Sequence, residues 1–173
     1  MQPVPVVPIQ AAVSLLEKTP GLLELLLRDV PQDVLEWKPA SERWSILEVL
    51  THMVAIEELY EQRTRRMVLD DSPALPPYVE PEEIKLNRKT VRQKLEQFTG
   101  LRRAFVYYLH SIPSTAAART GRHHEMGTFT LSQMLHELAN HDLGHFRQIA
   151  ELYRGHAFYP FAGPFQKFSN PKP

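Results

Sequence analysis

Apolar residues recur every three to four positions along four stretches of the chain, which is the spacing of an amphipathic helix. The stretches cover residues 9–30, 46–69, 90–112 and 131–154. No stretch alternates apolar and polar residues convincingly, as a half-buried strand would. We therefore expect an all-α fold, an antiparallel four-helix bundle.

Two of these stretches begin with a capping box, in which a hydroxyl side chain and a side chain three residues later satisfy the first N–H groups of a helix. Ser45 and Glu48 form one box, and Thr130 and Gln133 form the other. Gly155 is expected to end the last helix, because glycine adopts the backbone conformation that follows many helix ends.

The first stretch is interrupted by Thr19 and Pro20, which suit an N-cap and the first position of a helix. We expect either two short helical pieces or one kinked helix. The proline-rich residues 70–83 and the residues 113–129 are expected to be connections.

No repeat of fixed period divides the chain, so residues 1–173 are predicted to form one domain. Its proline-rich start, residues 1–8, and its aromatic and proline-rich tail, residues 156–173, are expected to be irregular. The start resembles neither a signal peptide nor a membrane span.

Composition narrows the classes of function. Twenty basic residues balance twenty acidic ones, so the chain offers no basic field for nucleic acid or an anionic membrane. There is no cysteine, which leaves nitrogen and oxygen as the metal ligands and excludes disulfides and thiolate catalysis by the chain itself. We expect a cytoplasmic protein without nucleic-acid or membrane partners.

His141 and His145 are four residues apart, about 40° around a helix and about 6 Å along it, so their imidazoles can converge on one ion. His52 lies on the apolar side of the second long helix and would enter the same core. The three are either metal ligands or core histidines satisfied by other partners. His136, about 140° around the helix from His141, should not reach the same ion.

The segment "WSILEVLTHM", with Trp44 and His52, followed far downstream by "HELANHDLGHFRQI", closely resembles the DinB/YfiT-like superfamily. The resemblance covers nearly the whole chain. It implies a four-helix fold, commonly dimeric, with a divalent ion held by His52, His141 and His145. Family members with assigned activities include thiol-dependent transferases, isomerases and metal-dependent hydrolases.

The sequence departs from the commoner family wording at two positions. Glu137 stands one turn before His141, where many members carry histidine, and Arg147 lies one residue further from His145 than the familiar spacing. Glu137 could orient a ligand imidazole, add a carboxylate ligand or act as a general base. The alternative is a partly exposed helical glutamate without such a role.

These observations favour a metal-dependent enzyme acting on a small molecule, either a hydrolase or a thiol-dependent S-transferase. Zinc or nickel is the expected ion, with iron and manganese as alternatives, and a low-molecular-weight thiol is the expected cosubstrate of the transferase. A homodimer is expected. The competing hypothesis is a metal-binding or dimeric interaction protein without turnover. His123 and His124 are expected to be solvated on a loop.

Overall fold

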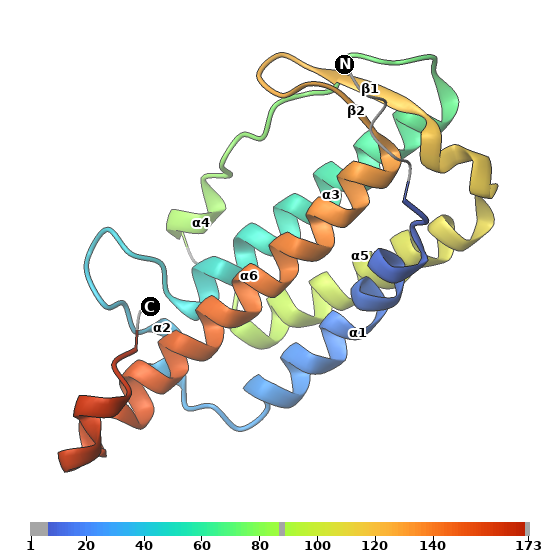
Figure 1. Cartoon of the computed structure of the whole chain (residues 1–173). Helices are drawn as coiled ribbons and strands as arrows, with labels where there is room; N and C mark the ends of the chain where they lie inside the picture. Colours follow the sequence, from blue (N-terminus) through green and yellow to red (C-terminus); the bar gives the residue numbers. More distant parts are fainter. Residues whose placement is uncertain (1–6, 87–88, 172–173) are drawn as a thin grey trace.

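The structure, a computed structural model, describes residues 7–86 and 89–171, so most of the predicted irregular start at 1–8 lies outside the described residues. Four long helices form the body of the molecule (Figure 1). The elements in chain order are α1 (Gln10–Leu27), α2 (Gln32–Glu36), α3 (Ile46–Leu69), α4 (Glu83–Leu86), α5 (Val91–Ser111), the 3-10 helix η1 (Ser114–Ala118), β1 (Thr120–His123), β2 (Gly127–Thr130), α6 (Leu131–Ala157), and the 3-10 helices η2 (Tyr159–Phe161) and η3 (Gly163–Phe168).

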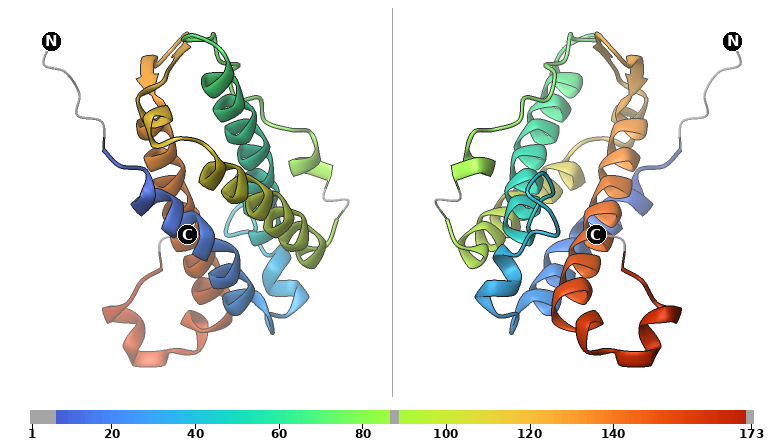
Figure 2. Two further views of the ribbon diagram at one scale, coloured as in Figure 1. Left: turned by 90° about the vertical axis from the view of Figure 1, so that its right-hand side faces the viewer. Right: turned by 90° about the vertical axis from the view of Figure 1, so that its left-hand side faces the viewer.

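The predicted four-helix bundle is confirmed, and its helices pack in the ring α1, α5, α3, α6. The long connection after α3 returns along the bundle, so α3 and α5 run in the same direction and both run antiparallel to α1 and α6 (Figures 1 and 2). In this ring α3 and α6 are antiparallel neighbours. The helix that carries His52 therefore packs directly against the helix that carries His141 and His145.

The first stretch forms one helix, with Pro20 inside it, so the prediction of an N-cap at Thr19 was wrong. Thr19 is buried, and its hydroxyl donates to the carbonyl of Leu15 at 3.1 Å. Proline has no N–H group, so Leu16, four residues earlier, keeps a carbonyl that its own helix does not use. Arg102 of α5 donates to this carbonyl at 3.2 Å.

Two further expectations need correction. The connection at 113–129 contains η1 and a short antiparallel hairpin, in which Thr120 pairs with Thr130 and His123 with Gly127. The hairpin was missed because strands of four residues are too short for an alternation of apolar and polar residues to be recognised. Gly127 supplies the positive φ of 73° that the turn between the strands requires. Gly155 does not end the last helix, which continues to Ala157 before the chain turns into η2 and η3.

Capping boxes mark the starts of α3, α5 and α6, whereas the N-cap of α1 makes no side-chain hydrogen bond. Both predicted boxes are present, Ser45 with Glu48 at α3 and Thr130 with Gln133 at α6. Because Thr130 also ends β2, the hairpin leads directly into α6 and fixes the start of the helix that carries two of the candidate histidines. No helix in the described part of the chain is both long enough and apolar enough to cross a membrane.

The core consists of two apolar clusters at opposite ends of the bundle. One contains Met67 of α3 and Phe105 of α5, and the other contains Leu50 of α3 and Phe98 of α5. Between these clusters lies a charged side chain that is only 1% exposed, Arg102. A polar layer therefore crosses the bundle at mid-height.

Candidate metal centre

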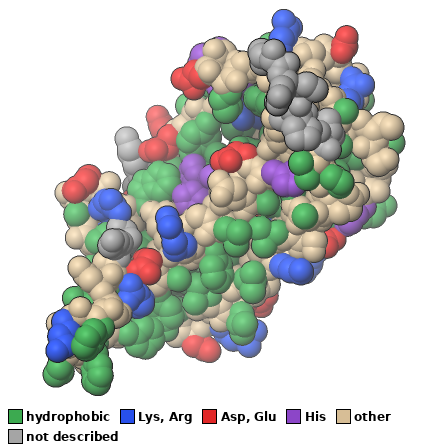
Figure 3. Space-filling model, viewed as in Figure 1, with side chains coloured by type: hydrophobic (Ala, Val, Ile, Leu, Met, Phe, Trp, Pro, Cys, Tyr) green, Lys and Arg blue, Asp and Glu red, His purple; other side chains and the backbone are tan. Residues whose placement is uncertain are grey.

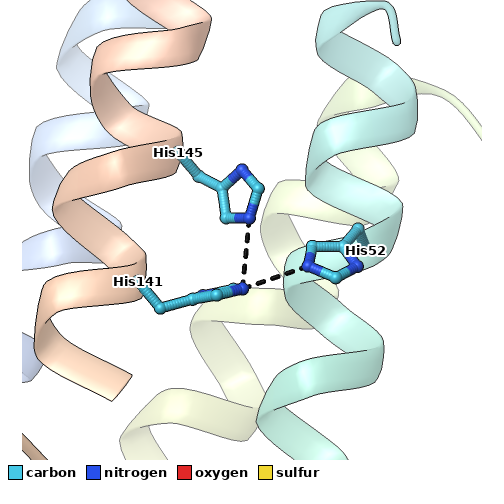
Figure 4. Close-up of side chains that lie close together, drawn as sticks. All are labelled: His52, His141 and His145. Carbon is cyan, nitrogen blue, oxygen red and sulfur yellow. Dashed lines mark hydrogen bonds between the residues drawn. The ribbon is translucent and has the colours of Figure 1, made fainter. Parts of the chain in front are cut away.

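Three histidine side chains from two neighbouring helices point toward one another (Figure 4). The Nε2 atom of His141 lies 3.0 Å from Nε2 of His52 and 3.1 Å from Nε2 of His145. His52 comes from α3, and the other two come from consecutive turns of α6. Among the described residues, this is the group of histidine and acidic side chains whose geometry could hold a metal ion.

Hydrogen bonds between the rings cannot by themselves satisfy this arrangement. Nδ1 of His145 faces the acceptor Oε1 of Gln148 at 2.9 Å, so Nδ1 carries the hydrogen and Nε2 of that ring is bare. Neutral rings can then form at most one regular hydrogen bond among the three Nε2 atoms, and the other contact has no hydrogen of its own or places two hydrogens together. A cation shared by the three lone pairs removes this conflict, so the residues present fit a metal ion.

The protonation of the three rings favours a cation in the same way. Burial, together with repulsion from His145 and His141, lowers the pKa of His52 to about 3. Burial and His145 lower the pKa of His141 to about 4. Burial also lowers the pKa of His145, although the hydrogen bond to Gln148 acts in the opposite direction and raises it. The rings are therefore neutral near pH 7, which is the state in which imidazole ligates a metal.

Neighbouring side chains hold two of the rings in place. The hydroxyl of Tyr78 lies 2.9 Å from Nδ1 of His52, and Gln148 holds His145 from the following turn of α6. The indole of Trp44 packs against both rings, with centroid distances of 4.9 Å to His52 and 6.3 Å to His145. Contacts of this kind fix the ring orientation of ligating histidines.

The Nδ1 atom of His141 is buried and has no hydrogen-bond partner among the described residues. A buried, unpaired ring nitrogen is costly, on the order of 1–3 kcal/mol. Retaining such a group indicates that the position of the His141 ring serves something other than stability.

The site is accessible from one side. A groove of about 640 Å³ opens beside it, lined by His141, His145 and Gln148 from α6 and by Arg43 from the segment that precedes α3. Histidine side chains are visible near the middle of the face shown in Figure 3. A volume of this size is within the range of small-molecule sites.

The remaining histidines lie apart from this group. Nδ1 of His136 is 2.8 Å from the carbonyl of Ser132, one turn earlier, so His136 is engaged elsewhere, as its helical position predicted. His124 is exposed as expected. His123, the last residue of β1, has only 6% of its surface exposed, so the expectation of a solvated side chain was wrong for this residue.

Glu137 is exposed, and its carboxylate accepts a 3.4 Å hydrogen bond from Asn140. The structure does not bring it into hydrogen-bond contact with His141, and it is absent from the group of potential ligands. Its carboxylate lies close enough to Tyr60 to contribute to a raised pKa of that phenol, although burial is the larger cause. A catalytic role for Glu137 stays a prediction.

Sequence reasoning missed a buried ionic cluster next to the histidines. Arg102 donates two hydrogen bonds to Glu57 of α3, both 2.7 Å long, and a 2.6 Å hydrogen bond to Asp142 of α6. With the carbonyl of Leu16 in α1, this side chain contacts each of the other three long helices. Glu57 lies five residues after His52, and Asp142 directly follows His141. The cluster therefore fixes the spacing of the two helices that carry the site.

Comparisons with known proteins agree with this architecture. A sequence model of the family described as the DinB superfamily matches residues 15–149. Among solved structures, YfiT from Bacillus subtilis, described as a probable metal-dependent hydrolase with an unusual four-helix bundle topology, is similar with a TM-score of 0.77 and 18% sequence identity. The similarity covers 89% of this chain and 90% of YfiT. No curated protein sequence matches the chain.

Proposed function

Because this chain belongs to the DinB superfamily, whose sequence model matches most of its length, we propose that His52, His141 and His145 hold one divalent metal ion in a metal-dependent enzyme. The observation that carries the proposal is the convergence of the three Nε2 atoms at 3.0 and 3.1 Å. Three neutral nitrogen ligands match zinc or nickel, and three protein ligands leave coordination positions for other groups.

Hydrolysis of a small molecule is the reaction that this arrangement supports best. A divalent ion bound there supplies Lewis acidity, which polarises a carbonyl or related electrophile and makes water a stronger nucleophile. The groove gives a substrate access to His141 and His145, and the indole of Trp44 packs against the rings of His52 and His145. The similar protein YfiT, described as a probable metal-dependent hydrolase, supports this choice.

Thiol-dependent S-transfer is the second candidate. The ligands are three neutral imidazoles, so the full positive charge of the ion would favour an anionic partner such as a thiolate. The chain has no cysteine, so the thiol would be a low-molecular-weight cosubstrate. A groove of about 640 Å³ has room for such a molecule beside the histidines.

An accessible groove at the site favours turnover over a purely metal-binding or interaction role. Activity assays of the metal-loaded protein with simple esters and amides, and with pairs of thiol and electrophile, distinguish the two reactions. We expect a homodimer, which sedimentation analysis of the purified chain measures.

The metal site is tested by elemental analysis and calorimetric titration of untagged protein. We expect one equivalent of metal, with His52→Ala and His145→Ala losing binding to a similar extent although the residues are far apart in sequence. His136→Ala is the matched control on α6, because its ring is bonded to Ser132 and should leave binding unchanged. Loss of binding in His145→Ala with full binding in His52→Ala would contradict a shared site.

A further inference from the structure

One cation that lines the groove beside the three histidines, Arg147, makes no hydrogen bond or ion pair within the described part of the chain. We propose that the groove binds the anionic end of the substrate, a carboxylate or phosphate group, and that Arg147 is its main contact. This inference rests on the proposed metal-dependent function and adds the chemical class of the ligand. Arg147 lines the same groove as His141 and His145, so a single small molecule can reach both.

The charges around the groove support an anionic ligand. The guanidinium of Arg147 is exposed and makes no hydrogen bond or ion pair within the described part of the chain. The acidic residue of the lining, Glu151, is paired with Arg154 at 2.7 Å. Figure 3 shows a Lys or Arg side chain not far from a patch of histidine on this face of the molecule.

The shape of the groove also indicates a ligand site rather than ordinary helix surface. Gly144 lies between the two α6 histidines and lines the groove, and a Cβ atom placed on it would meet nothing within 4 Å. Glycine in a helix interior is destabilising relative to alanine, by about 1 kcal/mol. Its presence here keeps the space between the histidines and Arg147 open.

A guanidinium is suited to this role because its N–H groups form a planar fork that matches two oxygens of a carboxylate or phosphate. In a partly exposed groove such a contact strengthens binding about 5-fold to 10-fold. The remaining part of the ligand would then extend over Gly144 toward the histidines.

The test uses cobalt-loaded protein and hydroxamates, which bind divalent ions through two oxygens and change the visible spectrum of cobalt. Acetohydroxamate is neutral at its far end, whereas the monohydroxamates of succinic and glutaric acid carry a carboxylate there. We expect at least one carboxylated probe to bind about 5-fold to 10-fold more tightly than acetohydroxamate. Inorganic phosphate should weaken binding of the carboxylated probe more than binding of acetohydroxamate, because only the carboxylated probe would share the anion site with phosphate.

Arg147→Gln should remove the advantage of the carboxylated probe and leave the affinity for acetohydroxamate unchanged. Arg92→Gln is the matched control, because Arg92 is an exposed arginine of α5 paired with Glu96 and its replacement changes the net charge equally. Gly144→Met fills the groove without replacing a histidine. It should keep cobalt binding and the melting temperature while weakening the carboxylated probe.

The outcomes separate the two levels of the proposal. Equal affinities for neutral and carboxylated probes, or an undiminished advantage in Arg147→Gln, would overturn the anion site and leave the metal site standing. A protein that binds no cobalt, or whose bound cobalt does not respond to acetohydroxamate, would overturn the proposed function and this inference with it.

Discussion

Replacing Arg102 by methionine should leave two carboxylates without their cation at the centre of the bundle. Methionine keeps an unbranched apolar stem of similar length but removes every donor. Glu57 and Asp142 are 0% and 2% exposed, so water cannot replace the lost contacts. The carbonyl of Leu16, which Pro20 leaves unpaired within α1, would lose its donor as well.

The magnitude follows from the charges and contacts of this cluster. Arg102 is the cation that both carboxyl groups share, and burial raises the pKa of Glu57 even against the opposing effect of this arginine. Removing one partner of a buried ion pair costs about 3–5 kcal/mol. The orphaned Leu16 carbonyl adds about 1 kcal/mol. At about 2–4 °C per kcal/mol for a chain of this length, the melting temperature should fall by roughly 10–20 °C.

Thermal unfolding followed by far-UV circular dichroism at pH 7 measures this loss. Arg92→Met is the matched control, because it is the same substitution on the same helix at an ion pair whose side chains are 88% and 63% exposed. It should change stability by less than about 0.5 kcal/mol. Adding Glu57→Gln and Asp142→Asn to Arg102→Met should recover part of the loss. An Arg102→Met protein within about 1 kcal/mol of the parent would refute this reasoning.

Three further outcomes are expected. Metal-free protein should lose stability on acidification, because histidine in the unfolded chain takes up a proton near pH 6.5, whereas the pKa of His52 in the folded protein is about 3. Between pH 7 and pH 5 the free energy of unfolding should fall by about 2 kcal/mol from His52 alone. Equal urea midpoints at the two pH values would contradict this prediction. Tyr78→Phe removes the hydroxyl that orients His52, so calorimetric titration should show metal affinity lowered about 10-fold to 100-fold, whereas an unchanged affinity would exclude that role. Glu137→Gln should lower kcat and leave metal affinity unchanged if Glu137 is a general base; unchanged kcat on an identified substrate would reject the prediction.

Local sequence signals were sufficient to locate the four long helices and to group the histidines, although they misplaced a cap at Thr19 and a helix end at Gly155. The box of Ser45 and Glu48 marks the start of α3, and helical spacing places His141 and His145 on one side of α6. To predict that these two histidines meet His52, it was enough to assume that the second and fourth long helices pack against each other. These features depend on residues within one or two turns of each other and on the general rules of bundle packing.

The polar layer could not be predicted in this way. Arg102, Glu57 and Asp142 come from three helices, and charged residues on amphipathic helices usually lie in solvent. Their burial depends on a mutual geometry that the ring order of the helices creates. Tyr78 was missed for a related reason, because it lies in a proline-rich connection whose path is set by tertiary contacts.

The connection between α3 and α5 is anchored at two nearby points. Leu75 donates its N–H to the carbonyl of Arg122 in β1 at 2.8 Å, and Tyr78, three residues later, reaches His52. Insertions in loops usually cost little stability. The segment from Leu75 to Tyr78 differs, because both of its ends are held by hydrogen bonds and its length is therefore fixed. Lengthening it by one residue would detach the tyrosine from the histidine, whereas an insertion after Tyr78 would leave the contact intact. The spacing between hairpin and site is thus a constraint on chain length as well as on residue identity.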